Sequence, residues 1–206
     1  RFSTTCYSDE GQSRLADWGL YWSHDSQAIA FHESPLRLQN DSDIWLLDLT
    51  AEEIVNLTDD SIDGSFLDIA ESVNLDQLPI WDPVTGDLYF FRTTRTGEET
   101  YTNALYRIGA SDMGSDAEPE LVADLTDTFP EAFPVYDFSV TSLNGSADIS
   151  PDGTTMAFIA RPGGNRPEEM AIWLLDLASG DYQMVIPQTD IIAVGLPEWY
   201  LEEDSF

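Results

Sequence analysis

Short apolar runs alternate with polar turns along most of the chain. Three of these runs each follow a turn rich in Asp, Gly, Pro or Ser, as the second strand of a hairpin does. They cover residues 28–31, 88–91 and 156–159. Further runs follow at 44–49, 104–108 and 172–177, and then at 53–58, 120–122 and 182–186. All are too short for ordinary helices, so the pattern predicts an all-β chain.

The pattern is also repeated. The hexapeptide Ile-Trp-Leu-Leu-Asp-Leu occurs at residues 44–49 and returns unchanged at 172–177. In front of each copy, and once more between them, a Trp or Ile is followed nine residues later by Phe. Together with the start of a fourth unit, the repeat landmarks are Trp22, Phe31, Trp45, Trp81, Phe90, Ile149, Phe158, Trp173 and Trp199. Four short strands repeated about every 50 to 65 residues are typical of propeller blades.

We therefore expect an all-β partial β-propeller with three four-stranded antiparallel blades plus the first strand of a fourth. Trp45 and Trp173 should be equivalent and buried between blades. The expected segments are an N-terminal segment at 1–18 with a possible outer strand at 1–7, blade 1 at 19–60, blade 2 at 74–125, an aromatic linker at 126–144, blade 3 at 145–190 and the start of blade 4 at 191–206.

The motifs resemble the TolB-type β-propeller repeat, in which Trp-Ser-Pro-Asp-Gly, an Ala-Phe strand, an Ile-Trp-x-x-Asp-Leu strand and a Leu-Thr close follow one another. The resemblance rests on Trp22-Ser23, Ala30-Phe31, residues 44–49 and Leu57-Thr58 in the first unit, and on residues 150–153, Ala157-Phe158 and 172–177 in the third. It implies a propeller in the periplasm, at the cell surface or outside the cell. Related propellers act as scaffolds, as sensors and as gating domains of prolyl-oligopeptidase-like peptidases.

Three blades are fewer than the four to eight that close a propeller ring. We therefore expect the chain to be a fragment of a larger propeller or to be completed by another chain, and its first residue, which is not Met, agrees with this. Stacked repeats need covered end faces, so residues 1–206 alone should aggregate or oligomerise.

The net charge restricts the kinds of partner that the chain is expected to bind. The chain has 39 acidic residues and 8 basic ones, all of them arginine, which gives −31 at pH 7. Such a surface repels the phosphates of nucleic acids and anionic lipids, so nucleic-acid binding is disfavoured. Two interpretations stay open: a solubilising or salt-adapted surface, or a docking face for cations or a basic partner. No run approaches the ~20 apolar residues of a membrane span.

Residues for common kinds of catalysis are missing from the sequence. There is no Gly-x-Ser-x-Gly elbow, because Met113 follows residues 109–112 where a second Gly would stand. The two histidines, His24 and His32, are expected in a turn and at the surface. The single cysteine, Cys6, can form neither an internal disulfide nor a zinc cluster. The chain is therefore not expected to be an enzyme.

One acidic loop has the spacing of a calcium site. Oxygen-bearing side chains stand at Asp59, Ser61, Asp63 and Ser65, and Gly64 occupies the position of the sharp turn. The twelfth position is Ala70, so the bidentate Glu that closes such a loop is absent there. The loop is either a calcium site or an acidic connection between blades. No other cofactor is expected.

An aromatic linker is the second candidate site. Between residues 124 and 144 it carries Phe129, Phe133, Tyr136 and Phe138 among prolines and acids. A loop of this length with so many rings either packs on its own core or binds a protein partner.

The function predicted from these features is a non-catalytic TolB-like module for protein–protein interaction or scaffolding in an exported or cell-surface assembly. One alternative is an accessory or gating propeller of an exported prolyl-oligopeptidase-like hydrolase whose catalytic domain lies outside this chain. Another is a propeller that senses calcium or a small ligand.

Overall fold

The computed structural model describes residues 5–7, 13–35, 42–60, 74–97, 100–130, 147–160 and 171–187. Over these residues the chain forms three antiparallel sheets and a single-turn 3₁₀ helix, η1 (Ala110–Asp112). The all-β prediction is confirmed.

The first sheet, blade 1, has five strands in the order β1-β2-β3-β4-β5. They are β1 (Thr5–Tyr7), β2 (Ser13–Trp22), β3 (Ala28–Pro35), β4 (Asp43–Asp48) and β5 (Glu53–Asn56). β1 pairs with β2, the first strand of the four-stranded meander, and not with β5. The N-terminal segment therefore adds a strand at the inner edge of blade 1, and the expected outer strand is wrong.

The other two sheets are four-stranded meanders. Blade 2 consists of β6 (Asn74–Trp81), β7 (Leu88–Arg95), β8 (Tyr101–Ile108) and β9 (Glu120–Asp124). Blade 3 consists of β10 (Ala147–Ile149), β11 (Thr155–Ala160), β12 (Ala171–Asp176) and β13 (Tyr182–Pro187). The predicted first strand of a fourth blade, with Trp199, lies outside the described residues.

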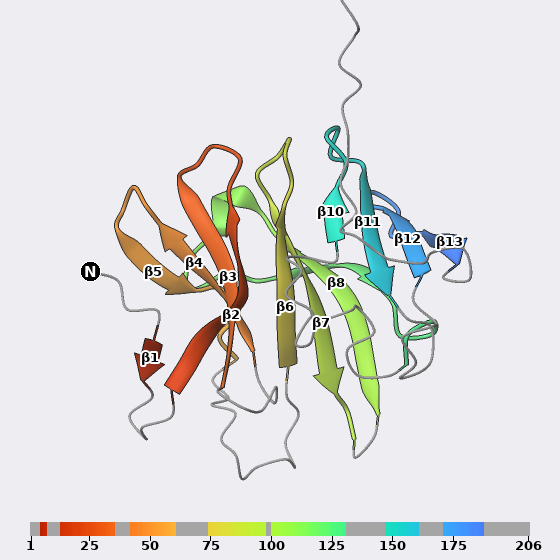
Figure 1. Cartoon of the computed structure of the whole chain (residues 1–206), viewed down its shortest axis with the longest axis horizontal. Coiled ribbons are helices and arrows are strands. Elements are labelled where there is room, and N and C mark those ends of the chain that lie inside the picture. Colours follow the sequence, from red (N-terminus) through yellow and green to blue (C-terminus); the bar gives the residue numbers. More distant parts are fainter. Residues whose placement is uncertain are drawn as a thin grey trace, which may run out of the picture.

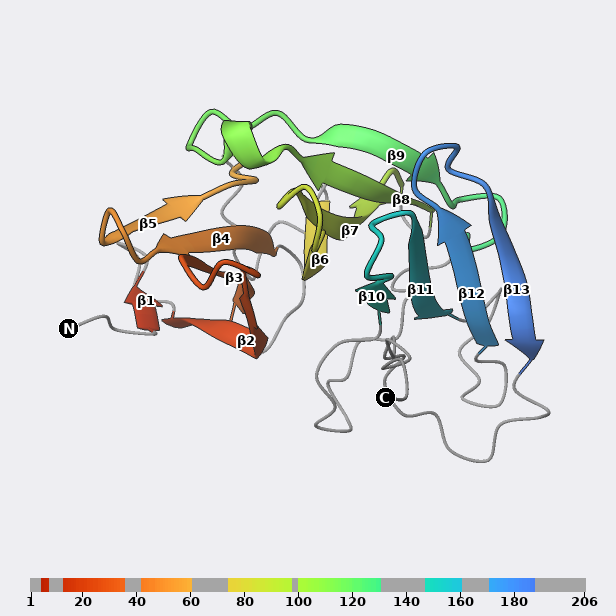
Figure 2. The same cartoon turned by 90° about the horizontal axis from the view of Figure 1, so that it is seen from above.

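The three sheets stand side by side, with the turns that follow β2, β6 and β10 all at the same end of the molecule (Figure 1). From above, the sheets follow one another along an arc, and each runs outward from its first meander strand to its last (Figure 2). β6 contacts both β10 and the strands of blade 1, so the first meander strands lie together. This arrangement is that of three consecutive blades of a β-propeller.

The strand registers place the repeat landmarks at equivalent positions. At the end of the first meander strand, Trp22 pairs with Ile29, Trp81 with Leu88 and Ile149 with Met156. Two residues along the next strand, Phe31 pairs with Trp45, Phe90 with Tyr106 and Phe158 with Trp173. The two residues nine positions apart therefore lie on neighbouring strands, and their side chains point to the same face of the blade.

Because side chains alternate across a strand, each blade has two faces. We call the face that carries Trp22, Trp81 or Ile149 the leading face, and the opposite one the trailing face. The leading face of blade 2 packs on the trailing face of blade 1, and the leading face of blade 3 packs on the trailing face of blade 2. The hydrophobic core is therefore a pair of layers between blades.

Local hydrogen bonds explain why the repeat keeps particular polar residues. In the first hairpin of blade 3, the Ser150 hydroxyl donates to Asp152 (2.6 Å) and accepts the Thr155 N–H (3.0 Å). Ser23, Asp25 and Ala28 make the same bonds in blade 1. Gly153 has a positive φ of 72°, which a residue without a Cβ adopts at little cost.

The Asp of the hexapeptide caps the next turn. In blade 1 it accepts the backbone N–H groups of Thr50 and Ala51, and in blade 3 those of Ala178 and Ser179. The Leu-Thr close is a further recurring device, because Thr58 Oγ1 accepts the Ile44 N–H (2.9 Å). Leu125-Thr126 repeats it in blade 2, where Thr126 Oγ1 accepts the Asn103 N–H at 3.1 Å.

Two predicted residue positions are corrected by the structure. Trp45 is equivalent to Trp173 but lies on the leading face of blade 1, half-buried, and not between two described blades. Of these two tryptophans, only Trp173 is buried between described blades. His32, expected at the surface, is buried, because it follows Phe31 on β3 and so points to the trailing face that blade 2 covers.

Candidate functional site

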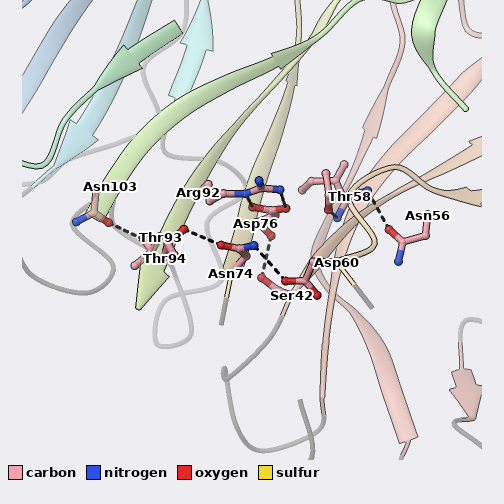
Figure 3. Close-up of polar contacts among 11 residues, drawn as sticks. Ser42, Asn56, Thr58, Asp60, Asn74, Asp76, Arg92, Thr93, Thr94 and Asn103 are labelled. Carbon is pink, nitrogen blue, oxygen red and sulfur yellow. Dashed lines mark hydrogen bonds and ion pairs between the residues drawn. The ribbon is translucent and has the colours of Figure 1, made fainter. Parts of the chain in front are cut away.

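A seam of polar residues joins blades 1 and 2 at the end of the molecule opposite the first hairpin turns (Figure 3). At its centre the Arg92 guanidinium makes two hydrogen bonds to the Asp76 carboxylate, both of 2.6 Å. The Asp76 side chain is 0% exposed. Arg92 also lies over the rings of Phe90 and Tyr106, at 5.5 and 4.9 Å from their centroids. Such a bidentate, stacked guanidinium is held in one geometry.

The electrostatics of this pair are set by burial. Burial raises the pKa of the Asp76 carboxyl, and the hydrogen bonds and positive charge of Arg92 act in the opposite direction. Burial also disfavours the charged form of Arg92, but the contacts with Asp76 raise the pKa of the guanidinium above its ordinary value. Each group therefore depends on the other to remain charged away from water.

Neighbouring bonds tie this pair to both blades. Ser42, the residue before β4, donates its hydroxyl to the Asp76 carbonyl (2.8 Å) and forms a parallel bridge with Leu75. Asn74 donates to Asp60 (3.1 Å) and accepts from the Thr94 hydroxyl (2.6 Å). The seam thus links blades 1 and 2 through hydrogen bonds from Ser42 and to Asp60.

A second tether leads from blade 2 to blade 3. The Asn103 side chain accepts from the Thr93 hydroxyl (2.6 Å) and donates to the Phe129 carbonyl (2.5 Å). The Phe129 ring is 1% exposed and packs edge-on against Trp173, with the ring centroids 5.0 Å apart. Phe129 therefore packs on the core of its own chain.

This placement corrects the proposed partner site in part. The aromatic linker was expected either to pack on its own core or to bind a protein partner. Phe129 packs on the core, so its ring is not accessible to a partner. Phe133, Tyr136 and Phe138 lie outside the described residues, so their role stays a prediction.

At the opposite end, a groove of about 500 Å³ lies between the hairpin turns of blades 1 and 2. Its acidic lining residues are Asp25, Asp48 and Asp82. Each of these carboxylates already accepts backbone N–H groups of its own turn. These three carboxylates therefore act as caps of the turns that line the groove.

The calcium hypothesis is untested by the structure. Of its four residues only Asp59 is described, and it is exposed at the end of blade 1. Ser61, Asp63 and Ser65 lie outside the described residues. Within the described part of the chain, no three His, Cys, Asp or Glu side chains gather in a way that could hold a metal ion.

The leading face of blade 1 is the largest departure from the packing of the other blades. It carries Trp22, Ile29, Phe31, Trp45, Leu47 and Ile54. None of these belongs to either hydrophobic core. Trp22 is 56% exposed, and the Trp45 indole N–H is shielded from solvent without a hydrogen-bond acceptor. By contrast, the Trp81 indole donates to the Tyr21 carbonyl of the preceding blade at 2.9 Å.

Sequence reasoning did not identify this face or the seam. A usable signal for the seam was the pairing of Asp76 and Arg92 on adjacent strands, two opposite charges facing one another in largely apolar surroundings. A signal for the face was the repeat itself, because the first unit of a stack has no preceding neighbour within its own repeats.

No protein-family model and no curated protein matches the chain. Among solved structures it is similar to an oligogalacturonate lyase from Vibrio parahaemolyticus, at 11% identity and a TM-score of 0.46, over 87% of this chain and 45% of that one. It is also similar to the β-propeller domain of the Trilobed protease from Pyrococcus furiosus, at 8% identity and a TM-score of 0.42, over 78% and 40%.

A further similar structure is prolyl oligopeptidase B from Galerina marginata, at 14% identity and a TM-score of 0.47, over 88% of this chain and 23% of that one. The chain thus spans less than half the length of each of these proteins. The strand order, the equivalent registers and the packing of blade on blade identify the chain as a partial β-propeller.

Proposed function

We propose that the chain is a non-catalytic, TolB-like propeller module that binds a protein through the leading face of blade 1, in an exported or cell-surface assembly. No helix in the described part of the chain is long and apolar enough to cross a membrane. The acids of the groove between blades 1 and 2 are engaged in turns, which agrees with a binding role and not a chemical one.

The observation that carries this proposal is the state of Trp22. Trp22 and Ile54 are exposed on this face, at 56% and 42%, whereas Ile29 is buried. Exposed apolar side chains that lie together mark protein contacts, and Trp is enriched among residues that dominate binding energy. The equivalent Trp81 shows what such a residue does when its face is covered, since its ring is buried and its N–H is bonded. The leading face of blade 1 lacks that cover among the described residues.

Photo-crosslinking tests this directly. A benzophenone amino acid is placed at position 22, or as a control at position 121, and the protein is expressed in its source organism. Leu121 is a matched control because it is similarly exposed, at 53%, on the outer strand of blade 2. We expect a specific protein adduct from position 22 and none from position 121. Equal labelling from both positions, or none from position 22, would contradict the proposal.

A further inference from the structure

The groove between the hairpin turns of blades 1 and 2 combines apolar and negatively charged lining residues. The buried side chains of Trp81 and Leu46 line it together with three aspartates. Its volume of about 500 Å³ lies within the range of ~300 to 1,000 Å³ that is usual for pockets of small organic ligands. No arginine is among its described lining residues. The groove therefore has room for an organic molecule, and its charge favours a cation.

Asp82 is a lining residue that departs from the repeat. It occupies the position directly after the first meander strand, where blade 1 has Ser23 and blade 3 has Ser150. All three side chains are buried, and Asp82 is only 2% exposed. Because the hairpins of the other two blades form with a neutral hydroxyl here, the fold does not require the charge of Asp82.

The buried charge of Asp82 has no positive partner among the described residues. Its Oδ1 accepts the N–H groups of Val84 and Thr85, at 2.7 and 3.1 Å, and no described group donates to its Oδ2. Asp76, a comparably buried carboxylate of the same blade, has the Arg92 guanidinium beside it. A counter-charge offsets the cost of burying a carboxylate. A cation bound in the groove would give Asp82 what Arg92 gives Asp76.

Blade 3 closes one side of this carboxylate. A Cβ added to Gly153 would lie 2.9 Å from Asp82 Oδ1 and 3.1 Å from Val84 Cγ2, so the first hairpin turn of blade 3 packs directly against Asp82. The described lining residues of the groove come from blades 1 and 2. A ligand therefore reaches Asp82 from the side of the groove.

The seam at the other end of the molecule shows how this fold holds a guanidinium. Arg92 makes two hydrogen bonds to a carboxylate and lies over aromatic rings. The groove likewise places the carboxylate of Asp82 beside the ring of Trp81. Asp25 and Asp48 add two carboxylates from blade 1, and both use Oδ1 to accept the N–H groups of their turns.

We propose that this groove is a binding site for an organic cation, a guanidinium or ammonium group on an apolar stem, with Asp82 as the main contact. The charged group donates to the carboxylate oxygens, and the stem lies against the apolar lining residues. None of the six residues of the leading face of blade 1 is among the described lining residues. The site therefore goes beyond the proposed function, and its test is independent of that function.

Isothermal titration calorimetry of the whole protein with acetyl-arginine amide measures this binding. Acetyl-citrulline amide is the matched control ligand, because it has nearly the same shape and carries no charge. At about 0.15 M NaCl we expect one arginine ligand to bind per chain with a Kd of about 1 mM or lower, and the citrulline ligand to bind at least ~10-fold more weakly. Equal binding of the two ligands, or no saturable binding of either, would overturn the proposal.

A matched pair of substitutions separates the groove from the general charge of the chain. Asp25→Asn changes a lining residue, whereas Asp152→Asn changes the equivalent residue of blade 3, which accepts the same bond from a serine but does not line the groove. Each removes one negative charge. Asp25→Asn should raise the Kd at least ~5-fold, and Asp152→Asn should raise it less than ~2-fold. Equal effects would mean that the ligand is attracted only by the net charge, and would overturn the proposal.

Two substitutions test Asp82 itself. Asp82→Asn keeps an oxygen for the N–H groups of the turn, and Asp82→Ser introduces the residue that the other two blades have, so one variant remains if the other does not fold. Each should raise the Kd at least ~30-fold. Added acetyl-arginine amide should raise the Tm of the parent and leave the Tm of both variants unchanged. A folded variant that binds the ligand as the parent does would overturn the proposal.

Further ligands distinguish the sources of such a cation. An acetylated Gly-Arg-Gly amide presents the guanidinium as a protein side chain does, and spermidine is a free polyamine. Tighter binding of the peptide supports a basic protein segment as the ligand, and tighter binding of spermidine supports a polyamine, provided that Asp82→Asn weakens the binding. If CaCl₂ binds in a way that depends on Asp82 and neither organic ligand does, the groove is a metal site and the proposal is wrong.

Discussion

The two copies of the hexapeptide have the same six residues in different surroundings. Trp173 is 7% exposed, packs on Phe129, Phe158 and Tyr182, and donates its indole N–H to the Ala160 carbonyl at 3.3 Å. Trp45 pairs with Phe31 in the same register but is half-buried, and its indole N–H has no acceptor. The difference arises because blade 2 covers the leading face of blade 3, whereas no described blade covers the leading face of blade 1.

This comparison separates what the repeat determines from what its position in the stack determines. Strand pairing, turn caps and the Leu-Thr close are the same in equivalent blades because they are local. Burial of the leading face depends on a preceding blade, so identical residues contribute different amounts to the free energy of unfolding.

The largest expected difference is between the two tryptophans. Trp173→Ala should lower the free energy of unfolding by roughly 3 to 5 kcal/mol, as for other fully buried aromatic residues. Trp45→Ala should cost clearly less in the monomer, because its ring is half-buried. Urea denaturation of both variants at low salt measures the difference. Equal losses would show that the leading face of blade 1 is covered as fully as that of blade 3.

The buried and exposed arginines of blade 2 offer a second comparison. Arg92→Met leaves the Asp76 carboxylate buried without its counter-charge, and should cost ~3 to 5 kcal/mol. Arg107→Met removes ion pairs with Glu120 and Asp87 from a guanidinium that is 38% exposed, and should cost less than ~1 kcal/mol. Replacing Asp76 by Leu together with Arg92 by Met should lose less than the sum of the single variants. Additive losses in denaturation experiments would mean that the pair is not a coupled unit.

Much of this fold could be predicted from the sequence, because its determinants are local. The spacing from Trp22 to Phe31 and the turn at 150–153 specify strands and register without knowledge of any distant residue. The burial of His32 and Phe129 could not be predicted in the same way, since each depends on which blade packs on its face. The partnership of Asp76 and Arg92 likewise required the knowledge that this end of β6 is covered by blade 1.

A smaller effect is expected at the tether between blades 2 and 3. Asn103→Leu leaves the Phe129 carbonyl and the Thr93 hydroxyl without their buried partner, and should cost about 1 to 3 kcal/mol. Thr96→Ala removes a hydroxyl whose bonds are exposed and should be close to neutral. Thermal denaturation compares the two variants. A neutral Asn103→Leu would mean that Phe129 is held by ring packing alone.

The smallest effect is expected on the stability of the protein at low pH. The hydrogen bonds from Ser150 and then Thr154 lower the pKa of Asp152 below its ordinary value of 3.8. A depressed pKa contributes stability that is present above the ordinary value and is lost as pH falls through the folded-state value. Asp152→Asn and Ser150→Ala should therefore flatten the loss of stability below about pH 4. If both variants lost stability with falling pH as steeply as the parent, this turn would not contribute to the pH dependence of stability.

The exposure of Trp22 relative to Trp81 tests the account most directly, because the two occupy one repeat position with and without a preceding blade. Hydroxyl-radical footprinting with mass spectrometry measures the oxidation rate of each. In the purified chain, Trp22 should be oxidised much faster than Trp81, because Trp22 is 56% exposed and Trp81 is 8% exposed. Equal oxidation rates of the two tryptophans would contradict the account.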